Sequence, residues 1–278
     1  MIDVTSERGS DRKRDARHRR RQQLAARAAH QLRRHLGGRQ FDDEAARTAL
    51  AALTGPYLPW SFGAMRPTGL VTVCNNIVLH GRRRVVELGS GVSTVLLARL
   101  LTQRHPVGEF RLVTVEHDRE WAQWVTGQLD REGLGGSVTV VHAPLRPHAL
   151  AESGLCWYDQ AALTYGLDTA LRGEPIDLLV VDGPPAYQSG NELARYPALP
   201  VLSERLAPGA TIVLDDIERT GEQEVLRRWE QQTGLVFDCK FAESGIATAT
   251  LACPTGGPRP EPTLSDLEQF SGQFAHRA

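Results

Sequence analysis

A glycine-rich turn between an apolar segment and a predicted helix is the first feature of this sequence that could bind a ligand. The segment VVELGSGVST spans residues 85–94. Gly89 and Gly91 allow a tight turn that leaves the amides at the start of the helix free to face a ligand. Such turns occur in all doubly wound proteins, so this segment alone does not identify the ligand.

An acidic residue ends the next apolar segment. Glu116 follows the glycine turn by about one helix and one strand, in VTVEHD. In nucleotide-binding sheets, a carboxylate at this place accepts hydrogen bonds from the ribose hydroxyls of an adenosine ligand. A lone glutamate at a strand end is more often a helix cap or a surface charge, but the preceding glycine turn favours the ribose role.

Two side chains of the turn distinguish between kinds of adenosine ligand. The dinucleotide pattern G-x-G-x-x-G needs a third glycine at position 94, where this chain has Thr94. Glu87 would repel a pyrophosphate, whereas it could bind an ammonium group or orient the turn. These residues favour an adenosine ligand with an amino-acid portion. A nicotinamide-dependent oxidoreductase remains the alternative.

Predicted strands and helices alternate along the chain and set where these residues lie. Apolar segments predict five strands, and helices are predicted before, between and after them. Two further segments predict a terminal β-hairpin. This order predicts an α/β fold with a doubly wound, mostly parallel seven-stranded sheet, an antiparallel last strand and an N-terminal helical extension. The predicted strands cover residues 84–88, 110–116, 137–142, 177–182, 211–215, 235–241 and 245–251, and the predicted helices include 68–80, 92–101, 119–129, 191–206 and 221–232.

The order of motifs resembles that of class I S-adenosylmethionine-dependent methyltransferases over roughly residues 60–252. The segments that carry the resemblance are ELGSGVST, VEHD, DLLVVDGPP and IVLDD, and the serine-threonine ending of the first is similar to that of cation-dependent O-methyltransferases. Ser93 departs from the third glycine of many members. The cofactor-binding set that the resemblance implies is Glu87, Gly89, Ser90, Gly91, Ser93, Thr94, Glu116, His117, the His142-Ala143 pair beside the adenine, and Asp182.

Carboxylates also end the fourth and fifth predicted strands. Asp182 ends DLLVVD, and Asp215 and Asp216 end TIVLDD. The carboxyl ends of parallel strands meet at one edge of a sheet, so the three side chains could bind a hard divalent cation such as Mg²⁺. This ion would lower the pKa of a substrate hydroxyl. Alternatively, Asp182 orients the substrate or a loop, and the other two cap the following helix.

Without a metal, an oxygen nucleophile needs a general base. Asp182 is the first candidate, followed by His142 and His117. The segment Gly183-Pro184-Pro185-Ala186 lacks the polar head and the aromatic end of the tetrapeptide with which amino-directed nucleic-acid methyltransferases hold a base. A nucleic-acid substrate is therefore not expected. Loop residues that could line a substrate pocket are Trp60, Arg66, Trp157, Tyr158 and Tyr187, although packing alone would explain many such aromatic residues.

Composition and patterning predict four parts of the chain. We expect a mobile basic arm over 1–22, a helical extension with a substrate-side loop over 23–80, a cofactor-binding domain over 81–253 and a flexible tail over 254–278. The formal net charge of −1 gives no case for nucleic-acid binding by the whole molecule. With no transmembrane or signal pattern, we expect a cytoplasmic protein that could pair as a homodimer through its N-terminal helices.

The sequence thus predicts an S-adenosylmethionine-dependent methyltransferase that acts on a small molecule, most simply at oxygen. A non-catalytic S-adenosylmethionine-binding protein whose basic arm recruits a partner is a second alternative. The acidic residues at the strand ends argue against it, because binding alone does not need them.

Overall fold

The computed structural model describes residues 43–55, 57–60, 63–151, 155–241 and 244–252. The predicted basic arm, the first part of the helical extension and the C-terminal tail lie outside these residues, and so does the larger part of the segment expected to form a dimer. Residues 43–54 are helical. Within the described part of the chain, no helix is long and apolar enough to cross a bilayer.

A seven-stranded sheet forms the centre of the molecule, in the order β3-β2-β1-β6-β7-β9-β8. Neighbouring strands from β3 to β7 are parallel, and β9 is antiparallel to both β7 and β8. The predicted doubly wound fold with an antiparallel last strand is confirmed. The strands are β1 (Arg84–Leu88), β2 (Arg111–Glu116), β3 (Val138–His142), β6 (Ile176–Val181), β7 (Leu206–Leu214), β8 (Asp238–Lys240) and β9 (Ile246–Thr250).

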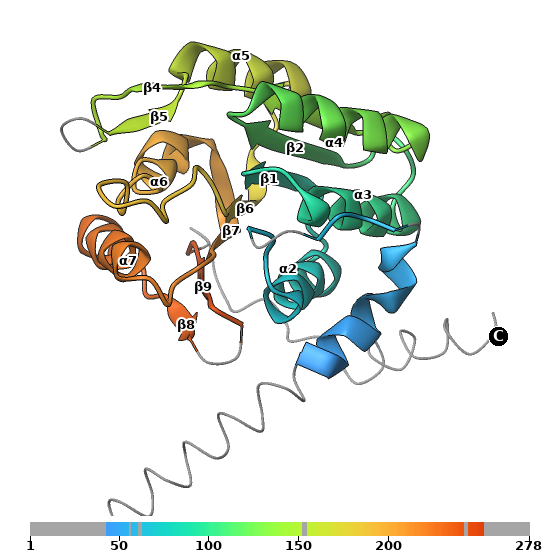
Figure 1. Cartoon of the computed structure of the whole chain (residues 1–278), viewed down its shortest axis with the longest axis horizontal. Coiled ribbons are helices and arrows are strands. Elements are labelled where there is room, and N and C mark those ends of the chain that lie inside the picture. The colour runs from blue at the N-terminus through green and yellow to red at the C-terminus, as the bar shows by residue number, and fades with distance from the viewer. Residues whose placement is uncertain (1–42, 56, 61–62, 152–154, 242–243, 253–278) are drawn as a thin grey trace, which may run out of the picture.

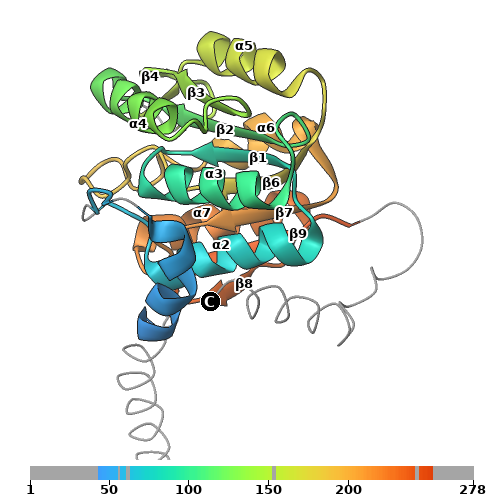
Figure 2. The ribbon, with the colours of Figure 1, turned by 90° about the vertical axis from the view of Figure 1, so that its right-hand side faces the viewer.

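Helices cover both faces of the sheet (Figure 1, Figure 2). Successive side chains of a strand point to opposite faces, so β1 buries Val85 against one helical layer and Val86 against the other. The first layer contains α2 (Pro67–His80), α3 (Val92–Arg104) and α4 (Arg119–Arg131), and the second contains α5 (Gln160–Leu171), α6 (Ala198–Leu202) and α7 (Thr220–Thr233).

Two predicted regions differ from the structure. The expected helix over 191–206 is reduced to α6 and one 3₁₀ turn at Ser203–Arg205, because Pro197 and Pro200 lack the N–H that a longer helix needs. The stretch 143–174, predicted to be less regular, contains the two-stranded ribbon of β4 (Leu145–Pro147) and β5 (Cys156–Tyr158), followed by α5.

The direction of winding reverses between β1 and β6. From β1 the chain builds outward to β2 and β3, and from β6 it builds the other way to β7. In open sheets of this kind, the carboxyl ends of the two central strands form a crevice in which ligands bind. Here those ends carry the glycine turn and Asp182.

Candidate active site

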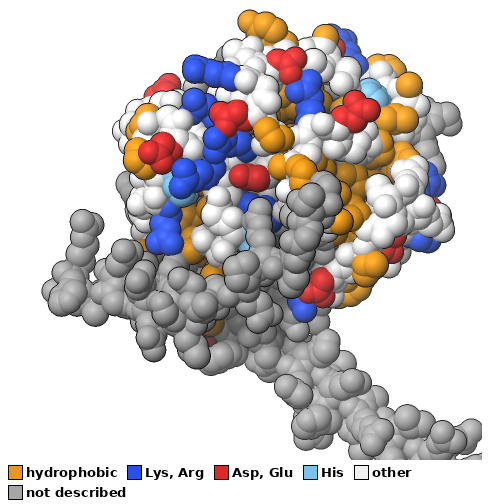
Figure 3. Space-filling model, turned by 180° about the vertical axis from the view of Figure 1, so that it is seen from behind, with side chains coloured by type: hydrophobic (Ala, Val, Ile, Leu, Met, Phe, Trp, Pro, Cys, Tyr) orange, Lys and Arg blue, Asp and Glu red, His pale blue; other side chains and the backbone are white. Residues whose placement is uncertain are grey.

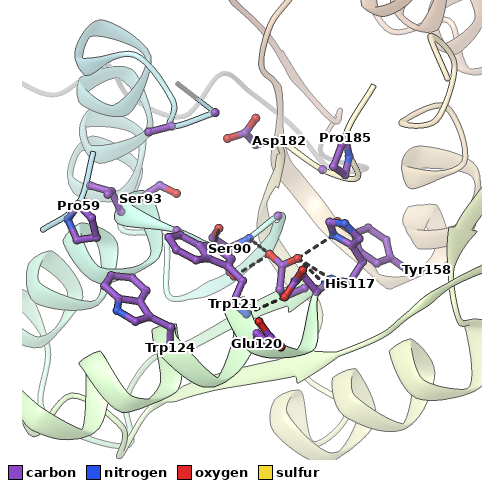
Figure 4. Close-up of a pocket in the computed structure, with 18 residues that line it drawn as sticks. Pro59, Ser90, Ser93, His117, Glu120, Trp121, Trp124, Tyr158, Asp182 and Pro185 are labelled. Atoms are coloured by element: carbon purple, nitrogen blue, oxygen red, sulfur yellow. Dashed lines mark hydrogen bonds and ion pairs between the residues drawn. The ribbon is translucent and has the colours of Figure 1, made fainter. Parts of the chain in front are cut away.

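A cavity of about 570 Å³ opens at the carboxyl ends of β1, β2 and β6. This volume is within the usual range for small-molecule pockets. In Figure 4, Asp182 and Pro185 lie on one side of the cavity, and Trp124 and Glu120 lie on the other. Of the residues predicted to bind cofactor, those that line the cavity are Gly89, Ser90, Gly91, Ser93, Glu116, His117 and Asp182.

The two central strand ends approach each other too closely for side chains. Gly89 has a φ of +90°, and a Cβ added to it would lie 3.1 Å from the carbonyl carbon of Asp182. A Cβ added to Gly183 would lie 2.9 Å from the Cα of Gly89 and 2.4 Å from the Tyr158 hydroxyl oxygen. Glycine is therefore required at both positions, and the sequence indicated only the first.

Glu87 and Thr94 hold the glycine turn from behind. The Thr94 hydroxyl donates to Glu87 Oε2 at 2.5 Å and accepts from the Gly91 amide at 3.0 Å. Glu87 is fully buried, and burial raises its pKa despite hydrogen bonds from neighbouring hydroxyls. Because neither Glu87 nor Thr94 is among the residues that line the cavity, we assign both the role of orienting the turn.

The carboxylate of Glu116 lies in the cavity wall and is surrounded by donors. Oε2 accepts from the Ser90 amide at 3.1 Å and from its hydroxyl at 2.8 Å. Oε1 accepts from the amides of His117 and Asp118 at 2.8 and 2.9 Å, and it is 2.8 Å from His117 Nδ1. Burial opposes ionisation of Glu116, but the His117 side chain and these amides outweigh burial and lower its pKa.

Two tryptophans of α4 were missed by sequence reasoning. Trp121 and Trp124 stack with centroids 4.8 Å apart, and both line the cavity. Trp121 Nε1 donates to the Ser90 carbonyl at 2.8 Å, which ties α4 to the glycine turn. The three-residue spacing places both rings on one side of the helix, and this was the signal that could have revealed them.

The carboxylates at the ends of β6 and β7 come together as predicted. One oxygen from each of Asp182, Asp215 and Asp216 lies within 4.8 Å of the other two. Asp216 has a φ of +62°, a left-handed conformation that aspartate adopts more readily than most residues. Asp215 and Asp216 do not cap α7, because the N-cap residue of that helix is Arg219 and there is no capping hydrogen bond from its side chain.

Arg195 lies within this carboxylate cluster and was missed by sequence reasoning. Its Nη2 is 3.2 Å from Asp182 Oδ1 and 3.0 Å from Asp216 Oδ2, and its side chain is 4% exposed. The buried carboxylates were a general signal that a cation must lie near, since buried charges are paired. Spacing alone does not indicate which arginine it is.

The cluster shifts the ionisation of its own members. Burial, and then the neighbouring charge of Asp215, raise the pKa of Asp182 well above its ordinary value. Burial, and then Asp216, raise the pKa of Asp215 to about 7. Arg195 opposes both shifts without cancelling them. Of the three aspartates, only Asp182 lines the cavity.

Several predicted site residues lie elsewhere. His142, the second candidate base, is paired in register with Glu116 but lines a separate depression beside α4. Ala143 is buried and its amide donates to the Glu116 carbonyl. Of the five predicted substrate residues, only Tyr158 lines the cavity. Trp60 and Tyr187 are exposed, and Trp157 is buried in the core. Arg66 forms an ion pair with Glu218 at 2.6 Å.

Tyr158 stands out among these because its hydroxyl is buried without a hydrogen-bond partner in the described structure. Burial, and then the charge of Glu116, raise its pKa, so the phenol keeps its proton. It therefore offers a donor at the cavity wall, beside the contact between Gly89 and Gly183.

Comparison with protein families identifies the domain that contains most of this cavity. A family model described as "Methyltransferase domain" matches residues 86–217, a range that contains the glycine turn, Glu116, Asp182 and the β7 aspartates. The chain contains an S-adenosylmethionine-dependent methyltransferase domain. The family resemblance of the sequence motifs is thereby confirmed. The matched range contains most of the residues that line the cavity, from Gly89 to Pro185, whereas Pro59, Gly63 and Ala64 lie before it.

Other comparisons give distant matches. A search of curated proteins found no significant match. Among solved structures, cofactor-bound Rv0187 from MTB is 22% identical to this chain, with a TM-score of 0.48. The match covers 79% of this chain and 90% of the Rv0187 chain. The O-methyltransferase from Bacillus cereus in complex with SAH is 19% identical, with a TM-score of 0.45 and coverage of 75% and 90%. The O-methyltransferase TomG from Streptomyces achromogenes is 20% identical, with a TM-score of 0.44 and coverage of 76% and 89%.

Proposed function

We propose that this methyltransferase transfers a methyl group to an oxygen atom of a small molecule, with Asp182 as the general base. The observation that carries the proposal is that Glu116 and Asp182 open into the same cavity from the ends of two strands that flank β1. Glu116, which would bind the ribose of the cofactor, and Asp182, which would accept the proton, are thus within reach of the same bound cofactor and substrate.

The cofactor half of the cavity suits S-adenosylmethionine. A carboxylate has about four acceptor sites, and five donors of the protein already surround Glu116. The Ser90 hydroxyl and the His117 ring are the two that side-chain rotation can withdraw. We infer that the ribose hydroxyls take their places, while the three amides keep the carboxylate fixed and ionised.

The other half of the cavity suits an oxygen nucleophile. When bound, S-adenosylmethionine supplies an electrophilic methyl group on a sulfonium. A neutral amine attacks such a group with its own lone pair, whereas a hydroxyl must first lose its proton, which requires a base. Asp182 accepts that proton as the new oxygen–carbon bond forms and the carbon–sulfur bond breaks, leaving S-adenosylhomocysteine. Its raised pKa brings it closer to the range in which a base is effective near neutral pH.

A divalent metal does not fit this half of the site as it stands. The three carboxylates are ligands of the type that Mg²⁺ prefers. However, the guanidinium of Arg195 already contacts two of them from within the cluster. We therefore assign the proton transfer to Asp182 and no step to a metal.

The described surface favours a small-molecule acceptor over a nucleic acid. A nucleic-acid substrate would need a continuous basic face. Figure 3 instead shows basic and acidic side chains interspersed on the face that it presents. Homodimerisation through the N-terminal helices remains a prediction, for which the test is the mass of the full chain in solution.

The test of this function is release of S-adenosylhomocysteine from S-adenosylmethionine in the presence of two matched acceptor panels, one hydroxylated and one carrying amines. Turnover with hydroxylated acceptors that is lost in Asp182→Asn supports the proposal. Turnover with amines alone would refute the oxygen assignment. Cofactor binding without turnover in either panel would favour the non-catalytic binding protein.

A further inference from the structure

One nitrogen of Arg195 bridges the carboxylates that end two different strands. Nη2 lies 3.2 Å from Asp182 Oδ1, after β6, and 3.0 Å from Asp216 Oδ2, after β7. These are two of the three carboxylates that could jointly hold a metal ion. The guanidinium thus makes the contacts between strand ends that a bridging cation would make.

Backbone carbonyls hold the guanidinium in this position. Nη2 donates to the Asp182 carbonyl at 2.6 Å, Nη1 to the Asp215 carbonyl at 3.1 Å, and Nε to the Pro184 carbonyl at 3.3 Å. The side chain is almost fully buried, so moving it would leave these buried carbonyls without a donor. An arginine also keeps its charge at any pH of interest.

A divalent ion would have to displace this arginine. Mg²⁺ needs its oxygen ligands at about 2.0–2.1 Å, so an ion between the oxygens of Asp182 and Asp216 would occupy the place of Nη2. An ion bound to the same oxygens from another side would lie close to a fixed positive charge in a buried environment, where like charges repel strongly. The charge of Arg219, 2.8 Å from Asp216 Oδ2, adds to this repulsion.

We propose that Arg195 is the built-in cation of this methyltransferase site, taking the place of a divalent metal between the ends of β6 and β7 and holding Asp182 toward the cavity. Arg195 is then a positioning residue, because it acts through Asp182. The role of Asp182 rests on the proposed function, whereas the exclusion of a metal can be tested without any turnover.

The first experiment is titration of the wild-type protein with Mn²⁺, in which the electron paramagnetic resonance signal of the free ion is measured. We expect no saturable site. A saturable site that Mg²⁺ competes for, and that Asp215→Asn removes, would overturn the proposal. This measurement decides the matter even if variants at position 195 do not fold.

The second experiment removes the cation. Arg195→Gln keeps hydrogen-bond donors but loses the charge. We therefore expect a saturable site for one Mn²⁺ that the wild type lacks, at least about tenfold tighter than any residual binding to the wild type, because the neighbouring like charge is gone. The added substitution Asp215→Asn should abolish this gain. Arg205→Gln removes a surface cation that pairs with Asp168 and should change nothing. A folded Arg195→Gln protein that gains no Mn²⁺ site would contradict the proposal.

The third experiment uses turnover, once an acceptor is known. The wild type should keep its full rate in EDTA, and Arg195→Lys, which restores the charge, should recover part of the rate lost in Arg195→Gln. Loss of the wild-type rate in EDTA, with recovery on adding Mg²⁺, would overturn the metal-free site while leaving methyl transfer itself intact. Absence of any turnover bears only on the proposed function, because the Mn²⁺ titrations do not depend on it.

Discussion

Glu116 and Asp182 end the two strands that flank β1, yet their surroundings give them opposite properties. Burial opposes ionisation of Glu116, but hydrogen bonds from the His117 side chain and from the amides of Asp118 and Ser90 lower its pKa. The side chain of Asp182 is 11% exposed and lies beside the aspartates at the end of β7. Burial, and then the charge of Asp215, raise its pKa well above the ordinary value although Arg195 opposes the shift. The two carboxylates face the same cavity.

Neighbouring groups, more than strand position, decide what a carboxylate at this edge of the sheet can do. Fixed amide donors favour the charged form, which suits a permanent acceptor for ribose hydroxyls. Burial and neighbouring carboxylates raise the proton affinity of a carboxylate, which suits a group that takes up a proton during the reaction.

The largest effect is expected at Asp182. Asp182→Asn removes the proton acceptor but keeps the shape of the side chain, so kcat should fall by about 100-fold or more. Affinity for S-adenosylhomocysteine, measured by calorimetry, should stay close to that of the wild type. Asp168→Asn, on the surface, is the matched control. A retained kcat would show that Asp182 is not the base.

The converse result is expected at Glu116. Glu116→Ala should weaken S-adenosylhomocysteine binding roughly 10- to 100-fold, since a hydrogen bond to a charged group contributes about 1.5–3 kcal/mol. Glu109→Ala is the control, because Glu109 is an exposed glutamate paired with Arg83. An affinity unchanged in Glu116→Ala would separate this carboxylate from the cofactor site.

The pH dependence should separate the two carboxylates. A base with a raised pKa is protonated as the pH falls, so kcat should drop about tenfold per pH unit below the apparent pKa of the pair formed by Asp182 and Asp215. Because the pKa of Glu116 is lowered, affinity for S-adenosylhomocysteine should be constant over the same range. Parallel loss of rate and affinity would contradict the division of roles.

The smallest effect is expected at the tie between α4 and the glycine turn. Trp121→Phe removes the bond from Nε1 to the Ser90 carbonyl, a contribution of about 0.5–1.5 kcal/mol, so cofactor affinity should fall roughly 2- to 10-fold. Trp124→Phe keeps an aromatic ring in the stack and leaves that bond intact, so it should have a smaller effect. Equal effects of the two changes would mean that the rings, rather than the bond, support the turn.

The cofactor half of the site could be predicted from the sequence because its parts are local. The glycine turn joins one strand to the next helix, and Glu116 stands one strand further on, so chain order alone places them at the same edge. The sheet was predictable for a similar reason, since buried parallel strands appear as continuous apolar runs such as the LLVV of β6.

The cluster at the ends of β6 and β7 could be predicted only in part. Strand ends indicated Asp182, Asp215 and Asp216, but their counter-charge comes from the irregular segment before α6. Arg195 is brought there by tertiary packing, and nothing in its local sequence distinguishes it from the many exposed arginines. The stacked pair of Trp121 and Trp124 was readable from helical spacing, whereas the orphan hydroxyl of Tyr158 follows only from packing against Gly183.

Whether the cavity binds S-adenosylmethionine or a dinucleotide is decided by calorimetric titration of the wild-type chain with S-adenosylhomocysteine, alongside a titration with NADH. We expect saturable, one-to-one binding of S-adenosylhomocysteine that is the same in Mg²⁺ and in EDTA, and no binding of NADH. Binding of NADH without binding of S-adenosylhomocysteine would show instead that the cavity at the glycine turn is a dinucleotide site.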